Sequence, residues 1–270
     1  MEVSHMKTLS DFNRWGEEIE MRLQLRTSPI AIKMLEKDED IPKEAKRPKR
    51  DLGLHLGLCQ AFAKSRREGV TVAMLKEDHW CYVPVIALGL AEPPDFFLEG
   101  QTDFPLRVAD LEAAKNLAKT SPRLEYGKYI GVVSAPLRTA SFAPDLTVIY
   151  CNSAQLRGLL TALKYKKGEM VTSTLNPGGA CVQSTVPALL SGACQVTIPC
   201  GGDSRRALAR DDELIFSIPA DRLEDVMSGL KHLDEMGTGY RQSAPDMRPE
   251  YPQSEMYIKL GKMVGMDVHE

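Results

Sequence analysis

The sequence predicts an α/β or α+β protein in which helices flank a mixed sheet. Short apolar runs rich in β-branched residues alternate with amphipathic or Ala- and Leu-rich runs along the chain. Glycine and proline separate these runs, as is typical of turns between elements. The chain has 270 residues, of which 43% are hydrophobic and 26% charged, so it can bury a sizeable core.

The elements follow from these patterns in chain order. Apolar residues recur at helical spacing over 8–25, so we predict a first amphipathic helix there, with Ser10 as its N-cap. Further helices are predicted at 59–67, 83–90, 108–120, 152–166, 181–192 and 220–236. Strands are predicted at 28–35, 70–75, 129–136, 145–151, 194–199 and 213–219.

Local signals refine these boundaries. Gly69 is expected to end the helix over 59–67, and Pro187 to kink or delay the helix over 181–192. The segment 168–175 is predicted to be strand or turn, and 92–100 a loop. The basic run 43–50 is interpreted as a solvated loop, and 256–265 as a last short element.

We predict one α/β domain over 6–236, followed by a loop-rich extension over 237–270. Residues 1–5 resemble a cloning remnant and are left out of the fold. The domain is expected to contain two related halves, about 6–125 and 126–236. The extension is expected either to wrap a neighbouring subunit in a homo-oligomer or to pack on its own domain.

Composition excludes several classes of function. The net charge of −3 argues against a broad nucleic-acid surface, which needs concentrated lysine and arginine. No apolar run is long enough to span a membrane, and the N-terminus lacks the apolar core of a signal peptide. We therefore expect a cytoplasmic protein whose six cysteines stay reduced. Neither a dinucleotide-binding fingerprint nor a phosphate loop occurs.

Two stretches share one layout. Cys59 begins a predicted helix, a strand follows, and Cys81 comes next. Cys181 likewise begins a helix, a strand follows, and Cys200 comes next. If the two stretches belong to related halves that face each other, the four cysteines converge on one place.

Four convergent thiolates suit an iron–sulfur cluster, zinc or Cu(I). The tight C-x₂-C pairs of structural zinc modules are absent, so classical zinc modules are disfavoured. Residues near the cysteines could tune such a site by hydrogen bonds, close backbone approach or positive charge. These are Gln60, Gln183, Gly201, Gly202, Arg205, Arg206 and Lys33.

Simpler interpretations remain open for several residues. Free cysteine is often only a buried apolar residue, and we expect this of Cys194 and, with a minor chance of being a ligand, of Cys151. His55 and His79 are alternative ligands or bases, or surface histidines without a role. Lys33 is either an inward cation facing a ligand or the exposed side of an edge strand.

Five motifs occur in order along the chain: LGLCQAF (56–62), HWCYVPVIALGL (79–90), the strand and NSAQ (146–155), GGACVQ (178–183) and IPCGGDSRRALARDDELIFSIP (198–219). With them the chain resembles the uncharacterised ArCR family, domain of unknown function 169, from about Leu9 to Met236. The family is found mainly in anaerobic archaea and bacteria, and its pattern has cysteines that match Cys59, Cys81, Cys181 and Cys200. This resemblance strengthens the expectation of a four-cysteine site but implies no settled activity.

The leading hypothesis is an iron–sulfur protein of anaerobic metabolism with a 4Fe–4S cluster, which exchanges electrons with a redox partner, senses redox state or performs chemistry at the cluster. The second is a metal-free enzyme or binder of a small anionic ligand. In that hypothesis Lys33, Arg205, Arg206 and the glycine turns form the anion pocket, and one cysteine could be a nucleophile. The third is a structural zinc protein or a metal-free interaction module. The sequence does not decide whether the protein is an enzyme.

Overall fold

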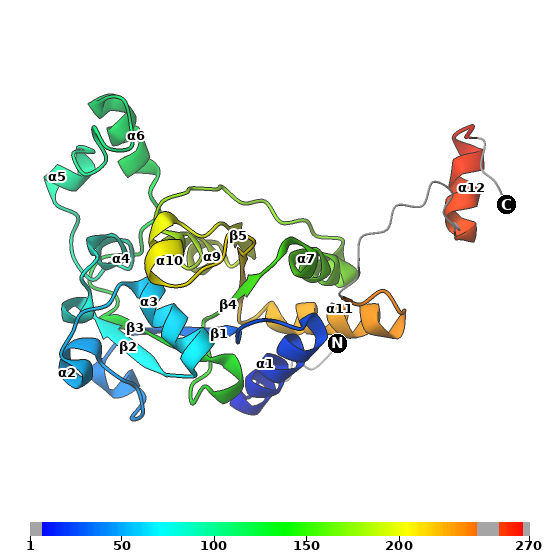
Figure 1. The fold of residues 1–270 in the computed structure, drawn as a ribbon, viewed down its shortest axis with the longest axis horizontal. Coiled ribbons are helices and arrows are strands. Elements are labelled where there is room, and N and C mark those ends of the chain that lie inside the picture. Colours follow the sequence, from blue (N-terminus) through cyan, green and yellow to red (C-terminus); the bar gives the residue numbers. More distant parts are fainter. Residues whose placement is uncertain (1–6, 242–253, 267–270) are drawn as a thin grey trace. The chain divides into compact units, whose positions relative to one another are not determined.

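The computed structural model describes residues 7–241 and 254–266. It divides into a compact unit that ends at Tyr240 and a second unit that starts at Arg241. The first unit is built on a six-stranded sheet of order β2-β3-β1-β4-β6-β5 with helices around it (Figure 1). The strands are β1 (Ile30–Leu35), β2 (Val72–Leu75), β3 (Gly131–Pro136), β4 (Leu146–Cys151), β5 (Gln195–Thr197) and β6 (Leu214–Pro219).

This architecture confirms the predicted class of helices around a sheet. All five pairings between these strands are antiparallel, and parallel pairing is limited to isolated bridges outside them, Lys46 with Val72 and Leu56 with His79. At the centre of the sheet β1 pairs with β4, so that Ile30 lies opposite Val148.

The strand order is symmetric about the β1–β4 pair. In each half of the sheet the second strand in sequence lies at the edge and the third lies between it and the first. β3 therefore belongs with β1 and β2, so the two halves of the sheet meet at β1 and β4, and along the chain the boundary between them falls after β3 and before β4. The helices that carry Cys59 and Cys181 occupy equivalent places, because each lies between the first and second strands of its half.

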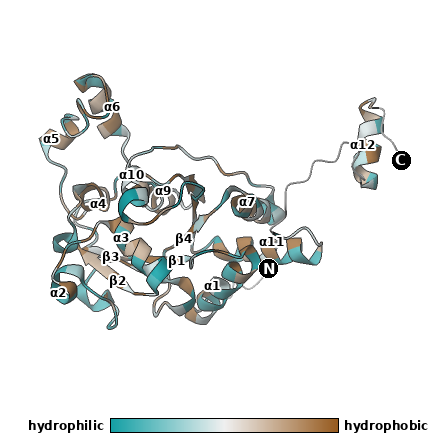
Figure 2. Cartoon of the chain, viewed as in Figure 1, coloured by the Kyte–Doolittle hydropathy of each residue, from teal (hydrophilic) through white to brown (hydrophobic). Residues whose placement is uncertain are grey.

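Long helices cover one face of the sheet. They are α1 (Leu9–Leu23), α7 (Ser153–Lys167) and α11 (Leu223–Glu235), and their apolar sides form one core with the strand residues that point the same way. Figure 2 shows hydrophilic and hydrophobic residues alternating along α1, as expected of a helix with one face in water. α7 and α11 pack against each other most closely at Gly229, where no side chain stands between the backbones.

Short helices cover the other face. They are α3 (Leu58–Ala63), which continues as a π-helix over Lys64–Glu68, together with α8 (Ala180–Gln183), α9 (Val186–Ser191) and α10 (Gly201–Arg206). A second core lies beneath them and includes Cys59 and Cys181. As predicted, Pro187 divides the segment, because it lies in the first turn of α9 and α8 has already ended at Gln183.

Several sequence predictions are wrong in detail. Thr8, not Ser10, caps α1, because the Thr8 hydroxyl accepts the N–H of Asp11 while the Asp11 carboxylate accepts the N–H of Thr8. The segment 92–100 is not all loop, since α5 (Asp95–Leu98) forms within it. Residues 168–175 form no strand. The basic run 43–50 is not simply a solvated loop, because α2 (Pro48–Leu52) starts in it and Arg47 is buried against Asp78.

The remaining helices of the first unit are α4 (Tyr82–Ala87) and α6 (Leu111–Thr120). The second unit holds α12 (Glu255–Met263), where the sequence predicts a last short element. The expected cloning remnant, residues 1–5, lies outside the described residues, and so do residues 242–253 and 267–270 of the predicted C-terminal extension.

Candidate functional site

Each of the four matched cysteines lies at the start of a short helix. Cys59 and Cys181 are the second residues of α3 and α8, whereas Cys81 and Cys200 immediately precede α4 and α10. α3 contacts both α8 and α10, and α4 contacts α8. These helix starts therefore gather on one side of the sheet, although they come from distant parts of the chain.

A short backbone pairing brings the first two cysteines together. The N–H of Leu56 donates to the carbonyl of Asp78 at 3.0 Å, and the N–H of Trp80 donates to the carbonyl of Leu56 at 3.1 Å. The segments that lead into Cys59 and Cys81 thus run side by side as a parallel bridge. This pairing is formed between residues too far apart for a local sequence signal.

The four thiols lie within electrostatic range of one another. Burial, together with the smaller effects of the nearby Asp203, Cys200 and Cys81, raises the pKa of Cys59 to about 12. Burial also raises the pKa of Cys181 well above its usual value, with added contributions from Cys59, Asp203, Cys200 and Cys81. Without a bound cation, the thiols of Cys59 and Cys181 are therefore neutral at pH 7.

One side of the site faces solvent. Cys59 and Cys181 are buried, whereas Cys81 and Cys200 are only half-buried. Burial raises the pKa of Cys81, and the positive charges of Arg206 and Arg107 act in the opposite direction. Arg206 is thus the predicted basic residue that the structure places next to a cysteine.

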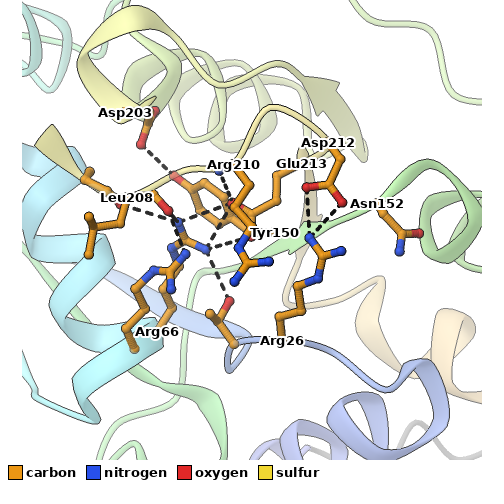
Figure 3. A network of polar contacts seen from close by, with 12 residues as sticks. Arg26, Arg66, Tyr150, Asn152, Asp203, Leu208, Arg210, Asp212 and Glu213 are labelled. Carbon is orange, nitrogen blue, oxygen red and sulfur yellow. Dashed lines mark hydrogen bonds and ion pairs between the residues drawn. The ribbon is translucent and has the colours of Figure 1, made fainter. Parts of the chain in front are cut away.

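A buried carboxylate completes the surroundings of the cysteines. Asp203 is fully buried, three residues after Cys200, and its Oδ2 accepts a weak hydrogen bond from the Cys200 thiol at 3.9 Å. The Tyr150 hydroxyl donates to Oδ1 at 3.1 Å (Figure 3). Burial raises the pKa of Asp203, while the hydrogen bond from Tyr150 and the charge of Arg66 oppose this rise.

An ion pair connects this region to the opposite half of the sheet. The Arg66 guanidinium donates to both carboxylate oxygens of Glu213, at 3.2 and 3.4 Å, and both residues are at most 4% exposed. The same guanidinium lies over the Tyr150 ring, 3.9 Å from its centroid (Figure 3). Arg66 therefore joins the π-helix of the first half to β4 and β6 of the second.

Gln60, the predicted residue beside Cys59, accepts hydrogen bonds from the backbone and from a neighbouring indole. Gln60 Oε1 accepts the N–H of Gly57 at 2.9 Å and the indole N–H of Trp80 at 2.7 Å. A Cβ on Gly57 would lie 3.2 Å from the Trp80 ring and 3.5 Å from Cys59 Sγ. The Trp80 ring and the Cys59 sulfur thus both lie close to one glycine.

The other predicted residues differ in their proximity to the thiols. A Cβ on Gly202 would lie 3.5 Å from Cys200 Sγ, whereas Gly201 is exposed. Gln183 is buried at the end of α8, and Arg205 is exposed on α10.

The structure does not bring Lys33 to the cysteines. Lys33 lines a cavity of about 760 Å³ with Asp145, which precedes β4, whereas Tyr150 lies near the other end of that strand. Lys33 therefore lies near the opposite end of the sheet from Asp203.

The remaining cysteines and the two histidines lie in different surroundings. Cys151 and Cys194 are buried in the core beneath the long helices, which confirms their interpretation as core residues, although Cys194 precedes β5 rather than lying within it. His55 is exposed. Both ring nitrogens of His79 are buried without a hydrogen-bond partner, and burial lowers the pKa of His79 to about 4.

Sequence reasoning missed Asp203, Tyr150, Arg66 and Trp80. The spacing from Cys200 to Asp203 is typical of a helix start, and it was the one available signal for α10. Two glycines opposed that prediction, since glycine is a poor helix former.

The described ranges, 7–241 and 254–266, contain neither a group of side chains arranged around a single metal ion nor a membrane-spanning helix. No three His, Cys, Asp or Glu side chains there are arranged to hold one metal ion. No helix in this part of the chain is long and apolar enough to cross a membrane.

Comparison with known proteins identifies the family. An uncharacterised protein of Methanocaldococcus jannaschii is 24% identical over 222 residues, which cover 81% of this chain and 93% of that protein. No solved structure matches the chain. Residues 18–229 match the family described as uncharacterised ArCR, and this range includes all four of the gathered cysteines. Since the match spans most of the sequence, the chain belongs to the uncharacterised ArCR family.

Proposed function

We propose that the protein binds an iron–sulfur cluster through Cys59, Cys81, Cys181 and Cys200. The observation that carries the proposal is the mutual proximity of four thiols, each of which enters the site from a different helix start. Cysteine thiolates are the usual ligands of such clusters, and four of them suit a 4Fe–4S centre. The cluster would supply one-electron chemistry when it is bound.

The state of the thiols supports a cationic ligand. Burial keeps the thiols of Cys59 and Cys181 protonated, and a buried thiolate without a partner would be costly. Iron would replace those protons, because a coordinating thiol is deprotonated by the metal. Gln60 would then hold the backbone at the start of α3. Gly202, which has no side chain, would leave room beside the Cys200 sulfur.

The cysteine pattern favours a cluster over structural zinc. Structural zinc modules usually draw on tight C-x₂-C pairs, and no such pair occurs in this sequence. The four cysteines come instead from separate helix starts. Within the residues that the structure describes, no three His, Cys, Asp or Glu side chains are arranged to hold a single metal ion, so the iron content decides between the two ligands.

The metal-free alternative has less support. A nucleophilic cysteine needs a lowered pKa, whereas those of Cys59, Cys81 and Cys181 are raised, primarily by burial. The anion pocket of that hypothesis also needs Lys33 beside Arg205 and Arg206, and Lys33 instead lines the cavity with Asp145.

The test is iron and acid-labile sulfide analysis, with a visible spectrum, of protein purified without oxygen. We expect about four iron and four sulfide per chain. Single Cys→Ser changes at each of the four ligands should lower both contents, whereas Cys151→Ser and Cys194→Ser should leave them unchanged as buried controls. Colourless protein without iron, or full iron in all four ligand variants, would refute the proposal, and one equivalent of zinc would favour the structural alternative.

A further inference from the structure

A positively charged and aromatic surface lies beside the half-buried cysteines. We call it the Trp–Arg rim and define it by Trp80, Arg205 and Arg206. Trp80 is 45% exposed, although its ring would lie 3.2 Å from a Cβ on Gly57, two residues before Cys59. The Arg206 guanidinium lies over the Trp80 ring, 4.8 Å from its centroid.

The positive charge of the rim is not neutralised by an ion pair. Within the described residues, Arg205 and Arg206 form no salt bridge. These charges stand out on a chain whose net charge is −3. Trp80 directly precedes Cys81, and both arginines lie on α10, which begins just after Cys200. An exposed positive patch of this kind attracts an acidic partner and raises its rate of association.

The aromatic part of the rim is held in place. The indole N–H of Trp80 donates to Gln60 Oε1, which also accepts the N–H of Gly57, so the ring is fixed against the start of α3. Tryptophan and arginine are the residues most enriched among those that carry the binding energy of protein interfaces. An exposed, oriented indole beside a buried sulfur thus has the properties of a contact surface for a protein.

We propose that the Trp–Arg rim docks a small acidic electron-carrier protein, which exchanges electrons with the site of the four cysteines. The proposal rests on the proposed function, because the cluster is the acceptor. Cys59, Cys81, Cys181 and Cys200 would hold the cluster, which would take up the one electron that the reduced carrier loses, with no bond formed or broken. The docking itself depends only on charge and on the indole, so it can be measured without the cluster.

The test uses the full chain and a plant-type 2Fe–2S ferredoxin as the acidic probe. Binding is measured by biolayer interferometry between about 0.01 M and 1 M ionic strength, over which the Debye length falls from about 30 Å to about 3 Å. We expect Arg205→Glu with Arg206→Glu to weaken binding at least about tenfold at low ionic strength, with the difference vanishing at high ionic strength. Arg157→Glu, an exposed arginine on α7, is the matched control and should retain the affinity.

Stopped-flow reduction of iron-loaded protein provides the second readout. The double variant should accept electrons more slowly from reduced ferredoxin, but not from the methyl viologen radical, a small cation that the added glutamates do not repel. Unchanged binding and unchanged reduction by ferredoxin in the double variant would overturn the inference. If binding weakens as expected but no iron can be loaded, the docking surface stands and the proposed cluster fails.

Discussion

The buried pair Arg66–Glu213 allows a quantitative test of how the two halves of the sheet are joined. Arg66→Met keeps the length and apolar stem of the side chain but leaves the Glu213 carboxylate, which is 4% exposed, without its cation. The change also removes the donors to the carbonyls of Ala207 and Leu208 and the charge over the Tyr150 ring. Breaking a buried pair from one side costs about 3–5 kcal/mol.

Such a loss is easily measured. For a unit of this size about 1 kcal/mol shifts Tm by about 2–4 °C, so the Tm of the metal-free protein should fall by about 6–20 °C. Adding Glu213→Gln removes the unpaired charge but keeps an acceptor for the N–H of Arg210, so the double variant should be more stable than Arg66→Met alone. A loss below about 1 kcal/mol, or a double variant less stable than the single one, would refute the reasoning.

Two further predictions concern the long helices. Gly229→Ala should lower the free energy of unfolding, measured in urea, by at least about 2 kcal/mol, because its Cβ would lie 2.0 Å from a backbone oxygen of α7. The control is Gly158→Ala, whose Cβ would meet only a leucine methyl at 3.5 Å and which should not destabilise the protein. Equal stability of these two variants would contradict the described packing. The hydrogen bond from Arg222 lowers the pKa of Glu169 below its usual value near 4.5, so the pair stabilises the protein above that pH and loses its effect as the pH falls through the lowered value. Glu169→Gln should therefore cost about 0.5–1 kcal/mol at pH 7, since the pair is partly exposed. This cost should shrink as the pH falls through the lowered pKa of Glu169, and a cost that is unchanged in acid would exclude the pair as its source.

The local patterns of the sequence were sufficient for most elements. Apolar periodicity predicted α1, α7 and α11, because helices that cover a sheet need one apolar side. Runs of β-branched residues predicted all six strands, because such runs pack on a pleated, buried surface. The break near Pro187 depends on a single residue and could be predicted directly.

Elements that are stabilised by residues far away in the chain were harder to predict from the sequence. α10 begins with two glycines and a fully buried aspartate, so only its contacts in the folded chain, such as the Tyr150 hydrogen bond to Asp203, favour it. Lys33 also shows this dependence on the folded chain, but here the sequence predicted a site residue that the fold places elsewhere. Its polar side chain in an apolar strand suggested a ligand site, but the sequence could not indicate which end of the sheet the side chain would reach.

The sequence by itself determined the helix–sheet class, the family and the four cysteines at equivalent places in a repeated layout, because each of these is written in composition, periodicity and motif order. Only the tertiary structure decided that β3 lies between β1 and β2, that the bridge of Leu56 with His79 brings Cys59 and Cys81 together, and that Asp203 is buried beside Cys200. These features arise from hydrogen bonds and burial between segments far apart in the chain. The free energy of these contacts depends on the whole packed sheet, so it cannot be predicted from any local stretch of sequence.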